Sequence, residues 1–307
     1  MKIKVAKENL EPIFVAGPTA SGKSDFAYFL ADNFESQVIS CDSMQIYQGL
    51  DVGTAKDSKE VLEKYNVKMV DIVPLDYDFS VAEYAERAKK EIENAIKNGK
   101  LPIIVGGTGL YFESLLYPMS FGEAPKDANV RAKYEQELKE KGNEYLYNKL
   151  LEMDPEASTV IHMADNKRIV RALEIMELTN KKWSEVKDNK PQINPIMVAF
   201  NTDRAKLYER INERVDKMMS LGLLDEVQKV NNFTYNSMKA IGYREFVDYN
   251  GDNLEQIVDK IKQDTRNYAK RQLTWFRKYP FVHWVEIGNY DDALSYIKTR
   301  LKTTEQF

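Results

Sequence analysis

The sequence predicts an α/β fold in which a mainly parallel sheet is flanked by helices and carries an all-helical insertion subdomain. Three observations lead to this prediction. A glycine-rich phosphate-binding pattern lies between an apolar run and an amphipathic stretch, at residues 17–24. Further short apolar runs alternate with longer amphipathic stretches, as in βαβ units. One long stretch in the middle of the chain has helical periodicity only.

The first element is a strand over residues 13–16, followed by the loop G-P-T-A-S-G-K-S and a helix over residues 25–33. The loop matches the pattern G-x-x-x-x-G-K-[ST] at every fixed position, so we expect a core like that of P-loop NTPases. Its backbone N–H groups and the start of the helix attract phosphate, Lys23 adds a full positive charge, and the Ser24 hydroxyl is a ligand for Mg²⁺. The residues predicted to bind the diphosphate or nucleotide are Gly17, Pro18, Thr19, Ala20, Ser21, Gly22, Lys23 and Ser24.

The next elements bring polar residues to the same sheet edge. A strand over residues 37–41 places Asp42 at its carboxyl end, where ligands of open α/β sheets bind. We expect a further strand at 67–73, a helix at 80–98 capped by Ser80, and a central strand at 101–105. That strand ends in G-G-T-G-L-Y, without the aspartate that orients Mg²⁺ in many P-loop NTPases. Glycines at this point let a bulky group approach the backbone, and Thr108 offers it a hydroxyl group.

The predicted domains are a first part of the core at 1–119, a helical insertion at 120–195 and a second part of the core at 196–307. In the second part we expect a strand at 196–200, a helix at 204–221 capped by Asp203, a helix at 254–278 and a strand at 283–287. Residues 261–280 contain six Lys or Arg residues and one acidic residue, interleaved with Tyr and Trp. This composition suits contact with single-stranded nucleic acid, and it is equally typical of an amphipathic helix with a basic rim.

Composition limits the class of protein. The chain has 307 residues, of which 43% are hydrophobic and 30% charged, and its net charge is −4. No apolar run approaches the length of a membrane span, and no apolar signal core follows Met1. Cys41 is the only cysteine, which excludes an internal disulfide and a cysteine-built zinc site. We therefore expect a cytoplasmic monomer that does not bind membranes.

Several motifs in a fixed order give the chain a resemblance to the bacterial tRNA dimethylallyltransferase (tRNA isopentenyltransferase) family. The resemblance covers roughly residues 12–285. It is carried by the phosphate loop and by S-C-D-S-M-Q-I-Y at 40–47, G-T-A-K at 53–56, G-G-T-G-L-Y at 106–111, R-I-V-R-A-L-E at 168–174, residues 210–218, G-Y-R at 242–244 and K-R-Q-L-T-W-F-R at 270–277. Three positions depart from the usual pattern: Asp57 in place of proline, Ala164 in place of asparagine and Ser24 in place of threonine.

The resemblance implies transfer of a dimethylallyl group from dimethylallyl diphosphate to N6 of the adenosine 3′ of the tRNA anticodon. Lys23, Thr108 and Arg214 would then act in catalysis, Arg214 by gripping the diphosphate. Asp42 is placed to take the proton from N6, although a Mg²⁺ ligand and an ion-pair partner are competing roles for it. The predicted contacts with the tRNA anticodon stem-loop are Asp42, Ser43, Met44, Gln45, Thr108, Arg131, Lys167, Arg168, Arg171, Lys239, Gly242, Tyr243, Arg244, Lys270, Arg271, Gln272, Trp275 and Arg277.

Three other functions remain open from the residues alone. A small-molecule kinase that uses ATP explains the phosphate loop and the α/β core equally well. A prenyltransferase of free adenine nucleotides, a sister activity, leaves the helical insertion and residues 270–277 without a purpose. A non-enzymatic RNA-binding protein with a nucleotide switch would not bind a prenyl diphosphate at all.

Overall fold

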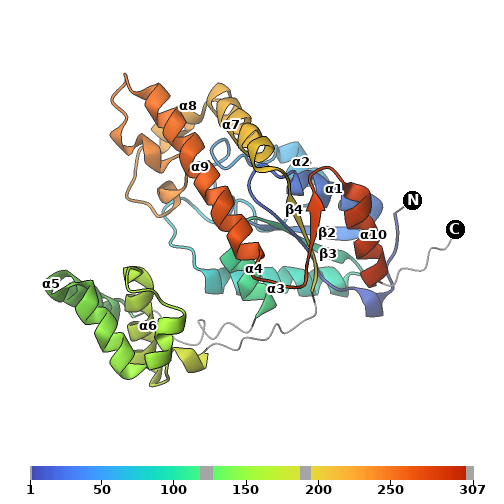
Figure 1. Ribbon diagram of the computed structural model, residues 1–307. Coiled ribbons are helices and arrows are strands. Elements are labelled where there is room, and N and C mark those ends of the chain that lie inside the picture. Colours follow the sequence, from blue (N-terminus) through green and yellow to red (C-terminus); the bar gives the residue numbers. More distant parts are fainter. Residues whose placement is uncertain (1, 118–126, 187–194, 302–307) are drawn as a thin grey trace. The chain divides into compact units, whose positions relative to one another are not determined.

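The computed structural model describes residues 2–117, 127–186 and 195–301 (Figure 1). The chain divides into two compact units. We call Met1–Phe112 together with Asn194–Phe307 the core unit, and Glu113–Ile193 the insertion unit. The predicted boundary at residues 119 and 120 lies outside the described residues.

The core unit is built on a five-stranded sheet in the order β2-β3-β1-β4-β5. All four neighbouring pairs of strands are parallel. β1 is therefore central, and it pairs on one side with β3 and on the other with β4, which follows the insertion unit in the chain. The strands are β1 (Ile13–Ala16), β2 (Ser36–Cys41), β3 (Leu101–Gly106), β4 (Ile196–Asn201) and β5 (Val282–Glu286).

Helices follow the strands as the periodicity predicts. Ser80 caps α3 by accepting a hydrogen bond from the backbone N–H of Glu83, and the Asp203 side chain caps α7. The helices are α1 (Lys23–Asn33), α2 (Lys59–Lys64), α3 (Val81–Lys97), α4 (Gly109–Leu116), α5 (Ala128–Met153), α6 (Asn166–Thr179), α7 (Arg204–Ser220), α8 (Leu223–Val230), α9 (Leu254–Phe276) and α10 (Tyr290–Leu301).

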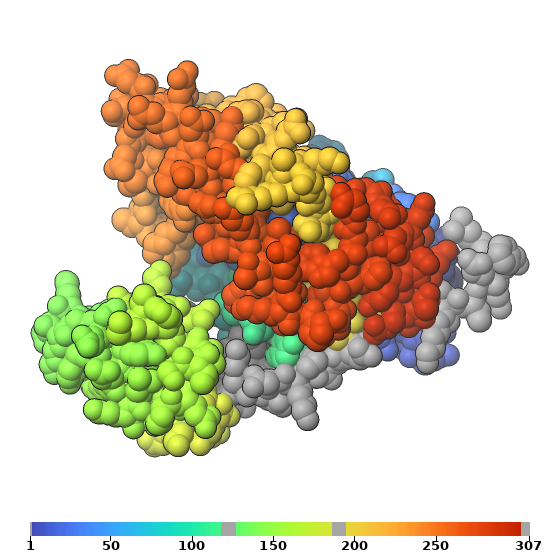
Figure 2. All heavy atoms as spheres, viewed as in Figure 1, coloured from blue at the N-terminus to red at the C-terminus, as the bar shows by residue number. Residues whose placement is uncertain are grey.

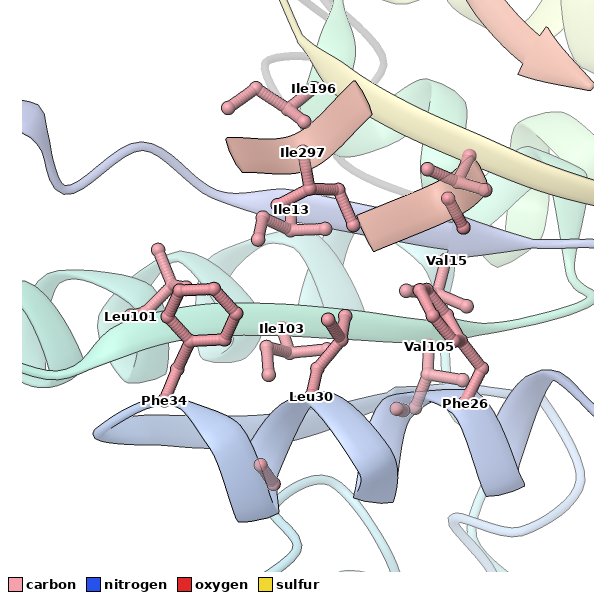
Figure 3. Packing of buried hydrophobic residues seen from close by; sticks show 14 of the residues in the cluster. Ile13, Val15, Phe26, Leu30, Phe34, Leu101, Ile103, Val105, Ile196 and Ile297 are labelled. Atoms are coloured by element: carbon pink, nitrogen blue, oxygen red, sulfur yellow. The ribbon is translucent and has the colours of Figure 1, made fainter. Parts of the chain in front are cut away.

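One face of the sheet packs against α1 and α10. Figure 3 shows Phe26 and Leu30 of α1 directed at Ile103 and Val105 of β3, with Ile13, Val15 and Ile297 in the same cluster. Side chains alternate between the two faces of a strand, so Phe14 points to the opposite face. There it lies against Phe112 of α4, which in turn meets Phe276 of α9 edge to face. The sheet is therefore covered on both faces, which explains why its strands are apolar throughout.

The insertion unit is helical in its described part, as predicted. α5 bends at Gly142, where the backbone leaves the helical region, and α6 packs against α5. Buried Leu146 and Leu150 of α5 and Ile169 and Leu173 of α6 form a separate hydrophobic cluster. The unit therefore has a core of its own.

One predicted strand is wrong. Residues 67–73 form only isolated bridges, between Lys68 and Ile39 and between Val73 and Tyr47. Met69 and Asp71 adopt positive φ angles of 65° and 54°, which interrupt the extended conformation. The other predicted strands are present, with ends that differ by a residue or two.

None of the helices within the described residues has the length and apolar character needed to cross a membrane.

The packing of α1 predicts a stability difference between two leucines. Leu30 is fully buried between α1 and the sheet, whereas Leu221 is 61% exposed after α7. We expect Leu30→Ala to lower the free energy of unfolding by about 2–5 kcal/mol, because it leaves a cavity in the core. Leu221→Ala should change it by less than about 0.5 kcal/mol. Urea denaturation followed by circular dichroism measures both values, and equal effects would contradict the packing.

Candidate functional site

The phosphate loop connects β1 to α1 and turns back on itself at the sheet edge. Gly22 adopts φ 76°, and α1 begins at the next residue. The Lys23 ammonium folds over the loop and donates to the carbonyl of Pro18 at 3.1 Å. The buried Ser21 hydroxyl has no hydrogen-bond partner among the described residues. The loop therefore encloses polar groups, and the Lys23 ammonium lies at the edge of the sheet that the carboxyl ends of the strands form.

Two hollows meet at this loop. The first, which we call the inner cavity, holds about 300 Å³ and lies between the phosphate loop, residues 42–45, residues 53–55, residues 239–244 and α9. The second, which we call the outer hollow, holds about 380 Å³ between the loop and α7. The residues that line both are Lys23, Ser24, Ala55, Asp57 and Arg214. A ligand with an anionic end and an organic end fits this arrangement, because the cations lie where the two spaces join.

The shared wall carries two cations, Lys23 and Arg214, that form no direct ion pair with any of the described residues, although Asp57 lines the same wall. Burial lowers the pKa of Lys23 from its ordinary value of 10.5 to about 8, and the nearby Arg214 lowers it further, whereas Asp42 raises it. Burial also lowers the pKa of Arg214, against the effects of Asp42 and Asp57, which raise it. Two cations in a poorly solvated space repel each other, so a bound polyanion would relieve an existing strain.

Asp42 is held by the turn that it begins. Its Oδ1 atom accepts from the backbone N–H groups of Met44 at 2.9 Å and Gln45 at 3.3 Å. Thr108 joins this turn to the loop after β3, since its Oγ1 atom accepts from the backbone N–H of Ser43 at 3.0 Å. β2 and β3 are neighbours, and this explains why Asp42 and Thr108 come together.

Tyr268 was not among the predicted site residues, yet it lines the inner cavity beside Asp42. Burial raises the pKa of its phenol to about 12, with a further contribution from Asp42, while a hydrogen bond with Thr108 opposes the shift. Tyr268 precedes Gln272 by one helical turn, so the helical spacing could have placed both on one face of α9.

Gln272 is buried in the core unit, where it lines the inner cavity and joins two loops. Its side chain is 5% exposed. It accepts from the backbone N–H of Thr19 at 2.9 Å and donates to the carbonyl of Gly107 at 2.9 Å. A Cβ atom added to Gly107 would lie 2.2 Å from the Gln272 amide nitrogen. Gly107 therefore leaves room for the Gln272 amide of the protein itself, whereas the neighbouring Gly106 lines the inner cavity.

Tyr243 is also a structural residue. Its side chain is fully buried, and its hydroxyl donates to Glu226 at 2.6 Å. The prediction that it contacts tRNA is not supported by this position, because the ring would have to leave the core. Neighbouring Arg244 is exposed and pairs with Asp264 at 2.9 Å, and exposed Lys239 lines the inner cavity.

The basic residues of α9 reach the surface near its end. Figure 2 shows the orange-to-red residues of this helix exposed beside the yellow residues of α7. Lys270 and Arg277 are exposed, and Arg271 lines the inner cavity. Trp275 is half-buried, and its indole N–H donates to the Tyr279 hydroxyl at 3.2 Å.

The predicted basic residues of the insertion unit are found on α5 and α6. Lys167 and Arg168 are exposed at the start of α6, where Arg168 pairs with Asp165 at 3.3 Å. Arg131 on α5 pairs with Glu135 at 3.2 Å, and Arg171 pairs with buried Glu174 at 3.0 Å. Lys167 and Arg168 are therefore better placed for a phosphate backbone than Arg171, whose charge is compensated within the unit.

Two further residues at the site were not predicted. Arg210 lines the outer hollow and donates from Nε to the carbonyl of Ala20 at 2.8 Å. The carbonyl of Thr54 accepts from the Arg214 guanidinium at 3.1 Å. A backbone acceptor carries no signal in the sequence. Arg210 precedes Arg214 by one turn of α7, so its place beside the same hollow follows from the helical spacing.

Comparison with known proteins agrees with this architecture. The family described as IPP transferase matches residues 45–279. The tRNA dimethylallyltransferase of Acetivibrio thermocellus is 45% identical over 296 residues, which cover 93% of this chain and 95% of that protein. The tRNA dimethylallyltransferase of Clostridioides difficile is 39% identical over 307 residues, covering 94% of this chain and 98% of that protein.

Solved structures are similar over the same range. The full-length tRNA isopentenylpyrophosphate transferase of Bacillus halodurans superposes with a TM-score of 0.71 at 35% identity, covering 95% of this chain and 97% of that one. A eukaryotic dimethylallyltransferase acting on tRNA superposes with a TM-score of 0.79 at 25% identity, covering 94% of this chain and 77% of that one. The chain therefore belongs to the IPP transferase family, that of the tRNA dimethylallyltransferases.

Proposed function

We propose that the protein transfers a dimethylallyl group from dimethylallyl diphosphate to N6 of the adenosine immediately 3′ of the anticodon in tRNA, and releases diphosphate. The observation that carries the proposal is the meeting of Lys23, Arg214 and Asp42 at one cavity beside the phosphate loop. The relatives named tRNA dimethylallyltransferase supply the group transferred and the acceptor. They favour this activity over phosphoryl transfer and over prenylation of free nucleotides.

The phosphate loop, Lys23 and Arg214 bind the diphosphate. When the bond between the allylic carbon and the diphosphate oxygen breaks, negative charge grows on the leaving group, and donors already fixed around it stabilise that charge. The guanidinium of Arg214 suits two-point contact with phosphate oxygens, and the Lys23 ammonium acts as a point charge. Because no water attacks phosphorus, residues that position a water for such an attack are not needed.

Ser24 would supply a hydroxyl ligand to Mg²⁺. It lines both the inner cavity and the outer hollow, next to the residues assigned to the diphosphate. Within the described part of the chain, no group of three or more His, Cys, Asp or Glu side chains is arranged to hold a metal ion. This fits Mg²⁺, which usually keeps several waters and binds through substrate phosphates and few protein groups. The bound ion would neutralise charge on the leaving diphosphate.

Asp42 takes the proton from N6 as the new carbon–nitrogen bond forms. The adenine amino group is a weak nucleophile, because its lone pair is delocalised into the ring. Among the described residues only the Oδ1 atom of Asp42 is engaged, by the backbone turn, so Oδ2 can receive the proton. Thr108, Ser43 and Gln45 lie around the same turn and would hydrogen-bond the extruded base.

The tRNA is held by the exposed cations of α9 and of the insertion unit. Contacts with phosphates from Lys270, Arg277, Lys167 and Arg168 would offset the cost of extruding the target base, which is about a few kcal/mol. A cytoplasmic location follows from such a substrate, and a monomeric state remains a prediction.

Asp42→Asn should abolish most turnover without weakening tRNA binding. The amide oxygen still accepts from Met44 and Gln45, so the turn is preserved, but the side chain can no longer take a proton. We expect the single-turnover rate to fall by about 10²–10⁴. Asp32→Asn, an exposed acceptor for Tyr65, is the matched control and should keep the wild-type rate. A near-normal rate in Asp42→Asn would show that Asp42 is not the base.

Diphosphate binding should weaken as the pH rises above about 8. Above this pH the Lys23 side chain of the free protein loses its proton, and it must take up a proton again when the anion binds. Below this pH the ammonium is already present, so the affinity should be nearly constant there. Above it, affinity should fall by up to about tenfold per pH unit. Calorimetry with inorganic diphosphate measures the effect, and Lys23→Arg, which stays charged, controls for titration of the ligand itself. The same slope in both proteins would remove Lys23 from the explanation.

Binding of tRNA should depend steeply on salt, whereas binding of the prenyl diphosphate should depend on it much less. Each phosphate contact releases counterions, so replacing both Lys270 and Arg271 with Ala should reduce the slope of log K against log salt by about two. Lys90→Ala, an exposed lysine paired with Glu86 on α3, should leave the slope unchanged. Filter binding of unmodified tRNA at several salt concentrations gives the slopes. A flat response in the wild-type protein would refute the assignment of α9.

A further inference from the structure

Glu226 on α8 is bound by four donors although it touches neither hollow directly. Its Oε2 atom accepts from the backbone N–H groups of Asp51 at 2.9 Å and Val52 at 2.8 Å. Its Oε1 atom accepts from the N–H of Gly53 at 3.0 Å and from the Tyr243 hydroxyl at 2.6 Å. Three successive N–H groups converging on one carboxylate form a strong, directional anchor for residues 51–53.

Thr54, the next residue in the chain, binds Arg214 of the candidate site through its backbone carbonyl. The carbonyl of Thr54 accepts from the Arg214 guanidinium at 3.1 Å. The same carbonyl accepts from the Gln45 amide at 3.4 Å, and the Thr54 hydroxyl donates to the carbonyl of Leu50 at 2.6 Å. The dipeptide Gly53-Thr54 is therefore held at one end by the bond from the Gly53 N–H to Glu226, and at its other end the Thr54 carbonyl bonds to Arg214.

The loop is also packed and paired from other directions. A Cβ atom on Gly53 would lie 2.4 Å from the Tyr243 ring, so the backbone is pressed against that side chain. Lys56, whose side chain is 2% exposed, pairs with Asp51 at 2.6 Å and Asp71 at 2.5 Å. These contacts leave the loop few alternative conformations while Glu226 is in place.

We propose that Glu226 is a positioning residue for the reaction: by fixing residues 51–53 it holds the Thr54 carbonyl where it aims Arg214 at the diphosphate. The proposal rests on the function proposed above. Arg214 lowers the pKa of Lys23, while Asp42 and Asp57 attract the guanidinium, so without a fixed acceptor it would not keep one orientation in the hollow that both cations share. The Thr54 carbonyl fixes that orientation, and it can do so only while the loop is anchored.

The test is a double-mutant cycle of Glu226→Gln with Arg214→Gln, read by the affinity for inorganic diphosphate. The Glu226→Gln side chain keeps its size, but its NH₂ group faces an N–H or O–H donor and leaves at least one bond unmade. In the wild-type background we expect affinity for diphosphate to fall by about tenfold. In the Arg214→Gln background the same change should have no further effect on affinity. The loss of thermal stability should be the same in both backgrounds.

The control is Asp225→Asn, which makes the equivalent change at the neighbouring exposed position of α8 and should leave diphosphate affinity unchanged. Tyr243→Phe removes one of the four donors and should give a smaller loss, which keeps the proposal testable if Glu226→Gln does not fold. Equal losses of affinity in both backgrounds, or a loss of stability without a loss of affinity, would overturn it. If Arg214→Gln alone left affinity unchanged, the proposed role of Arg214 and this inference would both fail. If Arg214→Gln lost affinity for diphosphate, but the effects of the two substitutions on binding free energy simply added, only the inference about Glu226 would fail.

Discussion

The burial of two cations in a poorly solvated space is the constraint on which the site depends. Lys23 comes from the end of the phosphate loop and Arg214 from α7, and among the described residues neither forms a direct ion pair with a carboxylate. Such an arrangement costs folding free energy, and proteins keep it where an anion relieves it. The sheet makes it possible, because its parallel strands bring the phosphate loop, Asp42 and Thr108 to one edge. α7 then contributes Arg214 across the outer hollow.

Long-range hydrogen bonds keep this edge rigid. Gln272 joins Thr19 of the phosphate loop to Gly107 of the loop after β3. Glu226 accepts hydrogen bonds from the backbone N–H groups of the residues that precede Thr54. Both side chains come from helices far along the chain, and neither is assigned to touch a reacting atom. Precise geometry at a site needs supporting residues of this kind, since a loop alone would let the charged groups separate. The Gln272 amide and the Tyr243 ring also occupy the space that a side chain would need at Gly107 and at Gly53, respectively.

Much of the fold and part of the site could be predicted from the sequence. Apolar runs predicted the five strands, and capping residues such as Ser80 and Asp203 predicted where two of the helices begin. The strand expected at 67–73 is absent, because positive φ angles at Met69 and Asp71 depend on tertiary contacts that periodicity does not report. Gln272 and Tyr243 carry polar groups within the motifs of the family resemblance, so the sequence pattern alone could not show that both form internal hydrogen bonds. Thr54 acts through its carbonyl, which every residue has.

The insertion unit lies in the sequence between β3 and β4, and this order has a consequence for biosynthesis. β1 pairs with β4, and residues 113–193 lie between the two halves of the core unit. During translation β1, β2 and β3 leave the ribosome while the neighbour of β1 on its other side has not yet been made, so an apolar strand edge stays open. The insertion unit has its own hydrophobic cluster and can fold in that interval. Nascent chains stalled before β4 should therefore recruit chaperones, and those stalled after β5 should not.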